Sequence, residues 1–239
     1  MDTERPPSKR ELKRHKRSEE LLDTSLKLLS EGGLDSFSLH KLARAVGLTV
    51  GALYRYFPSK GALIAALEDR VIDETARRLE RALELAAEQR GRVRAEIYPL
   101  GRFVALAYAY RARLHAAPEQ MRLIGGLMSN PTPMLEQEDA RRVLENMLRS
   151  LTPVREAIDE AVRLAMLQRG DGVKRALLTW TALRGAAETR KLTHRMPEIF
   201  DEDALFELAV RTLLLGWGAH PDAVDEAFHF AHALTQEGS

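Results

Sequence analysis

The segment from Ser36 to Leu63 reads SFSLHKLARAVGLTVGALYRYFPSKGAL and combines small, hydroxylated, aromatic and basic side chains over a short distance. Its Thr-Val-Gly-Ala run, residues 49–52, is small enough to let a backbone approach the edges of DNA bases, and Thr or Val methyl groups can contact a thymine methyl. Tyrosine hydroxyls and lysine ammonium groups suit phosphate oxygens. The chemistry that these residue types favour is recognition of a nucleic acid duplex.

Two short helices are predicted to position these side chains, Leu39–Val46 and Val50–Phe57, with Ser38 and Thr49 as their N-caps. Gly47 between them permits a tight turn, so the pair forms a helix-turn-helix, in which the second helix lies in the major groove. The apolar residues of the pair form a shared core, composed of Leu39, Leu42, Ala43, Val46, Leu48, Leu53 and Phe57.

The remaining side chains of the second helix divide by direction. Tyr54, two residues after Ala52, is expected on the exposed face, although packing between helices is the alternative for both Tyr54 and Tyr56. Arg55 is expected to point away from the groove as a solvated charge. Lys60 begins a long helix, Lys60–Gln89, whose N-terminal N–H groups also favour phosphate. Further phosphate contacts from the first helix are expected from Ser38, His40, Lys41 and Arg44.

Charge is distributed unevenly along the 239 residues. Residues 1–60 carry 12 Lys/Arg and 8 Asp/Glu, a balance of +4, and the other 24 Lys/Arg and 27 Asp/Glu give −3, which together make the net +1. A basic terminus indicates a polyanionic partner there. One helical face is shared by Arg10, Lys13, Arg14 and Arg17, which would extend the first helix along the DNA backbone or form a disordered arm in the minor groove.

The rest of the chain is dominated by helix signals, so the fold class predicted is all-α: a three-helix N-terminal domain joined by a long helix to a larger bundle. No apolar run is long enough for a membrane span and the basic N-terminus lacks a secretory signal, so a cytoplasmic location is expected. With no cysteine, disulfides and thiolate chemistry are excluded. Helices are predicted at 12–31, 39–46, 50–57, 60–89, 92–116, 118–129, 133–150, 153–169, 171–193, 202–219 and 221–235.

The helix-turn-helix segment resembles that of the TetR/AcrR family of bacterial transcriptional regulators over about residues 15–70. The residues that carry the resemblance are Ser38, Leu42-Ala43, Val46-Gly47-Leu48, Thr49, Leu53-Tyr54, Tyr56-Phe57 and Lys60, with Val46 in place of the usual Ala. The resemblance implies a homodimer on a palindromic operator, usually a repressor. It places His40, Thr49, Val50, Gly51 and Tyr54 near bases, and Ser38, Arg44, Tyr56 and Lys60 on phosphates.

Dimerisation is expected on the last long helices, where small residues allow close approach and large ones fill the seam. The alternative is an intrachain core with the same pattern. The domains predicted are a basic extension at 1–17, the helix-turn-helix domain at 18–62 and a ligand-binding and dimerisation domain at 63–239. The dimer residues predicted are Leu178, Ala182, Gly185, Ala186, Leu208, Leu215, Gly216 and Trp217.

A pocket for a small, largely apolar effector is expected among the middle helices, because methionine and aromatic side chains accommodate varied apolar ligands. Pro99 could kink its helix to open this space, and the loop at Asn130–Pro133 is the expected gate. Plain core packing is the alternative for each lining residue. The ligand-binding residues predicted are Phe103, Tyr108, Met121, Met128, Met134 and Trp180.

Other classes of function have weaker signals. His220, His229 and His232 lie close together in the sequence, but no catalytic metal motif, phosphate loop or nucleophile elbow is found, so neither an enzyme nor a cofactor is expected. The adjacent carboxylates Asp159-Glu160 and Glu202-Asp203 are interpreted as solvated charge. A basic adaptor that binds an acidic protein is the further alternative, which salt-dependent and sequence-selective duplex binding would distinguish.

Overall fold

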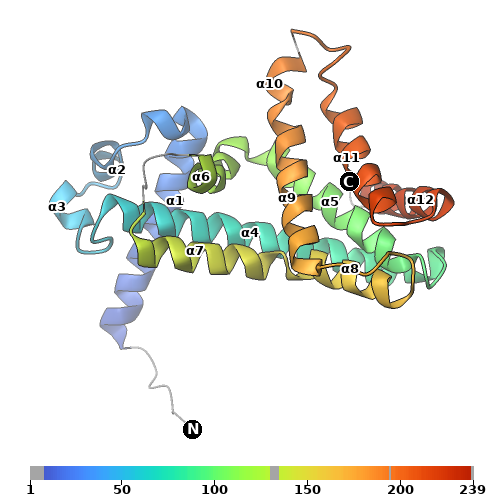
Figure 1. The fold of residues 1–239 in the computed structure, drawn as a ribbon. Helices are drawn as coiled ribbons and strands as arrows, with labels where there is room; N and C mark the ends of the chain where they lie inside the picture. Colours follow the sequence, from blue (N-terminus) through green and yellow to red (C-terminus); the bar gives the residue numbers. More distant parts are fainter. Residues whose placement is uncertain (1–7, 130–134, 194, 238–239) are drawn as a thin grey trace. The chain divides into compact units, whose positions relative to one another are not determined.

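The computed structural model describes residues 8–129, 135–193 and 195–237, and over these ranges it contains helices and no strand, as the sequence predicts (Figure 1). None of the helices described there combines the length and the apolar character that crossing a lipid bilayer requires. The helices are α1 Lys9–Ser36, α2 Leu39–Ala45, α3 Val50–Leu53, α4 Lys60–Glu88, α5 Tyr98–Ala116, α6 Pro118–Ser129, α7 Gln137–Ser150, α8 Thr152–Arg163, α9 Gly172–Glu188, α10 Arg190–Thr193, α11 Glu202–Gly216 and α12 Pro221–Glu237, with a 3₁₀ turn η1 at Arg90–Arg92.

The contacts within the chain divide it into two compact units. The N-terminal unit is Met1–Asp73 with Ala117–Met147, and the C-terminal unit is Glu74–Ala116 with Leu148–Ser239. The helix α4 begins in the first unit and ends in the second. This division differs from the predicted boundary at residues 62 and 63, because the sequence shows where α6 and α7 form but not which helices they pack against.

The N-terminal unit is built around the apolar face of α1, where Leu21 and Leu29 are fully buried beside Leu42 of α2 and Leu53 of α3 in the same core. Gly33 interrupts helical geometry within α1 with φ 71°, at the place where the sequence predicts the helix to end. Ion pairs fasten the helices at their surfaces. Arg70 of α4 bonds to Glu19 and Asp23 of α1, and Arg142 of α7 lies 3.1 Å from Asp69 of α4.

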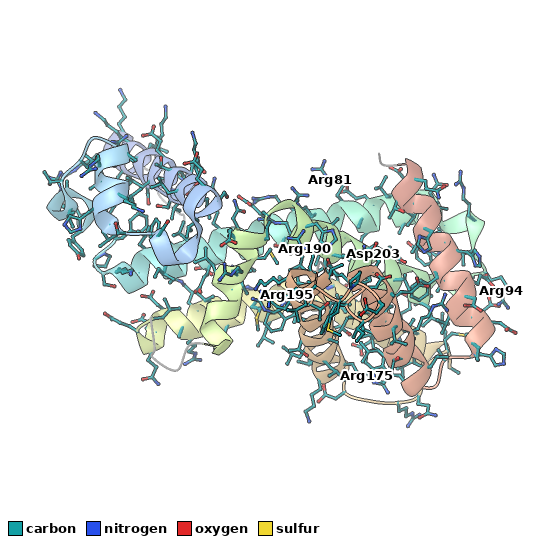
Figure 2. The ribbon with its side chains drawn as sticks, turned by 90° about the horizontal axis from the view of Figure 1, so that it is seen from above. Arg81, Arg94, Arg175, Arg190, Arg195 and Asp203 are labelled. Carbon is teal, nitrogen blue, oxygen red and sulfur yellow. The ribbon has the colours of Figure 1, made fainter. Side chains whose placement is uncertain are left out.

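The C-terminal unit packs α8, α9, α11 and α12 with α5, whose residues are mostly buried. The rings of Phe103 on α5 and Trp217 at the end of α11 meet edge to face with centroids 5.9 Å apart. In the segment that precedes α5, Arg94 bonds to Glu226 of α12 at 2.7 Å, and Figure 2 shows Arg94 beside that helix. These contacts make α5 the centre of the unit.

Several predicted helices differ from those observed. The helix expected from residue 92 begins at Tyr98, so Pro99 lies in its first turn, where a missing N–H needs no partner, and the expected kink is wrong. The segment expected to be helical up to residue 57 ends at Leu53 and continues as turns. The proposed gate at Asn130–Pro133 and the pocket residue Met134 lie outside the described residues.

Candidate DNA-binding site

The turn between α2 and α3 is held by backbone bonds and by two capping hydroxyls. Ser38 Oγ accepts a bond from the Lys41 N–H at 3.3 Å, and Thr49 Oγ1 accepts one from the Ala52 N–H at 3.2 Å, so both predicted N-caps are confirmed. Gly47 has φ 67°, in the left-handed region that a side chain disfavours, and the sharp turn there is the one that the sequence predicts.

The helix α3 presents small and aromatic groups to solvent. A Cβ built at Gly51 would meet no atom within 4 Å, and Gly51 has no positive φ, so neither packing nor backbone geometry in this chain requires glycine there. Tyr54 is 45% exposed, which favours its expected place on the outer face over packing between helices. The other expected contacts differ in exposure: His40, Arg44, Thr49 and Lys60 are exposed, and Ser38 and Val50 are half-buried.

Two arginines of α1 bond to the helix-turn-helix. Arg17 donates to the Val46 carbonyl at 2.9 Å and pairs with Glu20 at 2.7 Å, and Arg14 donates to the Arg55 carbonyl at 3.1 Å. A guanidinium that bonds to a backbone carbonyl fixes the position of that segment. Arg14 and Arg17, predicted as DNA contacts, therefore also hold the turn and the end of α3 against α1.

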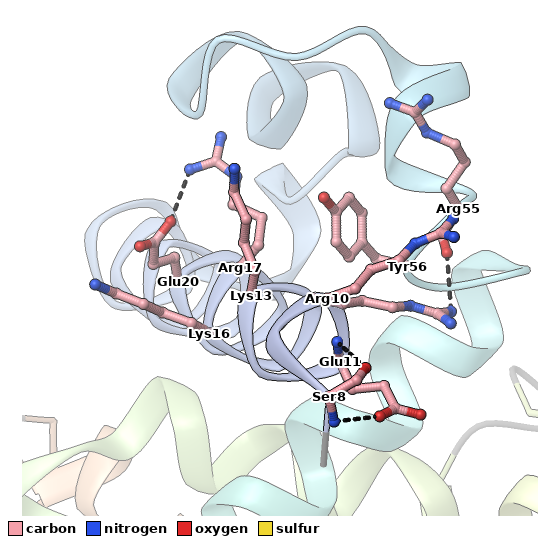
Figure 3. A pocket seen from close by; sticks show the side chains of 10 residues that line it. Ser8, Arg10, Glu11, Lys13, Lys16, Arg17, Glu20, Arg55 and Tyr56 are labelled. Carbon is pink, nitrogen blue, oxygen red and sulfur yellow. Dashed lines mark hydrogen bonds and ion pairs between the residues drawn. The ribbon is translucent and has the colours of Figure 1, made fainter.

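Residues 9–17 continue α1 as a helix, so of the two predicted forms of the extension the helical one is observed over these residues. Residues of this segment and of the turn after α3 line a groove of about 1120 Å³, which we call the basic groove (Figure 3). Tyr56 is half-buried in its wall. The residues lining it are Ser8, Arg10, Glu11, Lys13, Arg14, Lys16, Arg17, Glu20, Arg55 and Tyr56.

Two basic residues that line the basic groove, Lys16 and Arg55, are not among the predicted DNA contacts. Lys16 was not assigned to the site, although its position three residues after Lys13 gave a signal, because residues three apart are neighbours on a helix. Arg55 is predicted to be a solvated charge that points away from the DNA, yet it lines the basic groove. Its direction depends on α3 ending at Leu53, since the turn that follows redirects the next residues.

The predicted ligand-binding residues that the structure describes belong to both units. Phe103 and Trp180 are 2% and 5% exposed in the core of the C-terminal unit, whereas Met121 is buried in the N-terminal unit. Tyr108 lines a groove of the C-terminal unit. The side chain of Met128 is not described. Buried apolar side chains are more often core than cavity wall, and this alternative fits Phe103 and Trp180.

The predicted dimer residues remain largely on the surface. Leu178 of α9 and Leu208 and Leu215 of α11 are 49%, 59% and 43% exposed, and these two helices pack against each other. Gly185 and Gly216 are exposed, and a Cβ at either would meet nothing within 4 Å. Ala182 and Ala186 are half-buried, and Trp217 packs on Phe103 of its own chain.

The histidines are engaged separately. His229 Nδ1 lies 2.8 Å from the Asp225 carbonyl, and His232 Nε2 lies 3.0 Å from the Tyr108 hydroxyl. In the part of the chain that the structure describes, no three His, Asp or Glu side chains are placed to hold a metal ion together.

Comparisons with known proteins agree with this geometry. Residues 21–67 match the N-terminal domain model of the bacterial regulatory proteins of the tetR family. The nucleoid occlusion factor SlmA of Haemophilus ducreyi is 45% identical over 56 residues, which is 23% of this chain and 28% of that protein. The match thus spans less than a third of that curated relative.

Solved structures share the fold over most of the chain. RolR in complex with resorcinol has a TM-score of 0.60 at 17% identity, covering 92% of this chain and 95% of that one. The TetR family regulator PfmR of Thermus thermophilus has a TM-score of 0.50 at 20% identity, covering 83% and 97%. Residues 21–67 are thus a DNA-binding domain of the tetR family, and most of the chain shares the fold of these solved structures.

Proposed function

We propose that this TetR-family chain is a repressor that binds a palindromic operator as a homodimer and is released by a small, largely apolar effector. The face formed by α2, α3 and the start of α4 reads the major groove. On it His40, Thr49, Val50, Gly51 and Tyr54 contact bases, and Ser38, Arg44, Tyr56 and Lys60 contact phosphates.

The observation that carries the proposal is Gly51. Glycine inside a helix costs about 0.5–1 kcal/mol relative to alanine, and nothing within the chain needs the space that its missing side chain leaves. The requirement therefore comes from outside the chain. A DNA duplex lying close to the backbone of α3 supplies it, since base edges are reached only when the helix enters the groove deeply.

The basic groove adds phosphate contacts beside this face. Six of the residues that line it are Lys or Arg, and its two glutamates are engaged: Glu20 with Arg17 and Glu11 with Ser8. Arg10 and Lys13 are exposed members of the groove and are proposed to contact flanking phosphates. The excess of positive charge in the basic groove supports a polyanionic partner. Because the groove lies beside the proposed DNA-binding face, we take this partner to be the DNA backbone and not an acidic protein.

The homodimer is proposed on α9 and α11. Exposed Leu178, Leu208 and Leu215 supply apolar area, and the open space at Gly185 and Gly216 lets the helices of a second copy approach closely. In such a dimer the two α3 helices would lie about one DNA turn, roughly 35 Å, apart when competent to bind.

Release by an effector is proposed to act through α4. This helix begins at Lys60, a proposed phosphate contact, and its later turns belong to the C-terminal unit, where a ligand would bind. A change in the tilt of α4 would move the two α3 helices of the dimer away from a spacing of one DNA turn. RolR, which shares the fold, is a protein whose structure holds resorcinol, and this supports a small-molecule site in the present chain.

The test begins by selecting bound duplexes from a random pool with the full chain and then screening small molecules for release of the selected duplex. A palindromic sequence with half-sites about one turn apart is expected. Tyr54→Ala should stay folded and lose about tenfold or more in affinity. Wild-type affinity in that variant, or full operator affinity in the presence of every effector candidate that binds, would contradict the proposal.

The dimer has its own test. Leu208→Glu places a charge in the proposed apolar seam and should convert a dimer to a monomer in sedimentation experiments. Leu164→Glu is the matched control, because Leu164 is 45% exposed at the end of α8, outside the proposed seam. Equal sedimentation of both variants and the wild type would place the interface elsewhere.

A further inference from the structure

A groove on the C-terminal unit combines an aliphatic floor with arginine side chains. It has a volume of about 690 Å³ and is lined by residues of α4, α5 and α12. The floor includes Ala105, Ala109 and Ala112 of α5, which are four and three residues apart and so share one helical face, and Leu234 of α12. Small side chains at these positions leave the space that forms the groove, and an apolar molecule would lie there out of water.

Three arginines of α4, Arg77, Arg78 and Arg81, line the same groove, which we call the arginine groove. All three are exposed, and Figure 2 shows Arg81 projecting from α4. Within the described residues none of the three has a carboxylate at ion-pair distance. Glu74, the acidic residue among those that line the groove, bonds to the buried Arg113 at 3.1 Å. The groove therefore has more positive than negative charge.

The electrostatics of Arg113 agree with this excess. Burial lowers the pKa of its guanidinium, Glu74 opposes that shift, and Arg78 adds to it. Arg78 is thus close enough to Arg113 for repulsion to matter. An anion bound to Arg78 in the groove would relieve this like-charge repulsion as well as gain hydrogen bonds.

A tyrosine completes the polar lining. The Tyr108 hydroxyl lies 3.0 Å from His232 Nε2, and its ring packs on Phe206 with centroids 5.6 Å apart, so its position is fixed. Burial raises the pKa of the Tyr108 phenol, with Glu207 adding to the shift, so the hydroxyl stays protonated near neutral pH. A fixed neutral hydroxyl can bond to a ligand oxygen without adding charge.

We propose that the arginine groove binds a small amphipathic anion, whose carboxylate or phosphate group pairs with Arg77, Arg78 and Arg81 while its apolar body lies on the alanines of α5. Arginine suits both head groups because its planar fork bonds two oxygens at once. The inference rests on the proposed function only in identifying this anion as the effector. It adds an anionic end to the largely apolar molecule that the sequence predicts.

Direct binding of three probes to the full chain, in the absence of DNA, tests the groove. Calorimetric titration with decanoate, decyl phosphate and decanol should show the anions binding about tenfold or more tightly than the alcohol. The tighter of the two anions identifies the head group as carboxylate or phosphate. Equal affinity for decanol and both anions would overturn the inference, because the arginines would then contribute nothing.

Paired variants locate the site. Arg77→Gln/Arg81→Gln should weaken anion binding by about tenfold or more, whereas Arg169→Gln, which removes an exposed charge outside the groove, should leave it unchanged. Circular dichroism checks that both proteins are folded. Wild-type anion affinity in the double variant, or an equal loss in the control, would overturn the inference.

The same proteins separate the two proposals. If decanoate binds in an arginine-dependent way but leaves operator affinity unchanged, the groove stands and its role as the effector site is wrong. If no duplex is selected at all, the proposed function fails while the groove titrations still decide the groove.

Discussion

The basic groove and the arginine groove both have an excess of positive charge, but they differ in the number of aliphatic side chains that line them. The basic groove is lined by charged and hydroxylated residues of α1 and of the turn after α3, and by Ser8 just before α1, with no aliphatic side chain among them. In the arginine groove, seven of the thirteen lining residues are alanine or leucine. One surface therefore suits a hydrated polyanion and the other an anion with an apolar body.

The N-terminal caps of the helices also differ in charge between the two units. In the N-terminal unit α2, α3 and α4 are capped by the hydroxyls of Ser38, Thr49 and Ser59. In the C-terminal unit α9 and α11 are capped by the carboxylates of Asp171 and Asp201. A carboxylate caps a helix as well as a hydroxyl does, but it would repel a nearby phosphate. The uncharged caps fit the DNA-binding face that we propose for the N-terminal unit.

The largest effect is expected from filling the space at Gly51. Gly51→Leu should lower operator affinity by about 100-fold, because the side chain would hold α3 away from the base edges. Gly91→Leu is the matched control, since a Cβ at Gly91 of η1 also meets nothing within 4 Å. Fluorescence anisotropy with the selected duplex measures both, and equal affinities would remove the evidence that α3 enters the groove.

Two buried carboxyl groups, Glu68 of the N-terminal unit and Glu202 of the C-terminal unit, are expected to affect stability in opposite directions. Glu68 is 2% exposed, and one of its oxygens has no partner in the described structure. Burial, with Asp69 adding to it, raises the pKa of Glu68 from 4.5 to about 8. An acid with a raised pKa favours the folded state below about pH 4.5, and this advantage is lost as the pH rises through about 8.

Glu68→Gln should therefore raise the free energy of unfolding by roughly 2 kcal/mol at about pH 8, with the gain shrinking toward about pH 4.5. Glu202 is also buried, but it lies 2.5 Å from His115 and 4.0 Å from Arg190. Glu202→Gln should lower the free energy of unfolding by about 1–3 kcal/mol. Urea titrations across this pH range measure both, and changes of the same sign would contradict the contrast.

Removing two positive charges from one groove at a time tests whether the two grooves bind different ligands. Arg10→Gln/Lys13→Gln should weaken operator binding by about tenfold and reduce the slope of its salt dependence by about 1.8, because two phosphate contacts are lost. It should leave the affinity for decanoate unchanged. Arg77→Gln/Arg81→Gln should show the reverse pattern. If either double variant impaired both kinds of binding, the two grooves would not be independent sites.

The smallest effect is expected at a cap. Thr49→Asp keeps an acceptor for the Ala52 N–H, which lies 3.2 Å from Thr49 Oγ1 in the wild type, but adds negative charge on the proposed DNA-binding face. Operator affinity should fall about three- to fivefold, and more at low salt. Asp171→Thr, the opposite exchange at α9, should leave operator affinity unchanged. A fall of the same size in both variants would show that the effect arises from folding and not from charge near DNA.

Sequence reasoning succeeded where the determinants are local. The bounds of α6 are those predicted, the caps at Ser38 and Thr49 are confirmed, and Gly47 forms the predicted turn. A cap depends on an acceptor three residues away, and an apolar stripe depends on residues three and four apart. Such signals are present in any short window of the chain.

It failed where a partner lies far along the chain. Glu202 is predicted to be a solvated charge, but it is buried and meets His115 of α5, whereas its neighbour Asp203 is largely exposed, as predicted. Phe103 and Trp180 are buried in the C-terminal unit, and their role as ligand contacts stays a prediction. Composition indicates that a side chain is apolar or charged, and it does not indicate which helix will cover it.

The sequence by itself determined the helix-turn-helix, since its caps, its glycine turn and its apolar stripe lie within about thirty residues and act through neighbours on a helix. Only the tertiary structure decided where charge gathers. Arg77, Arg78 and Arg81 have the pattern of an ordinary solvated helix face. They line a groove because α5 brings alanines beside them and α12, about 150 residues later, brings Leu234.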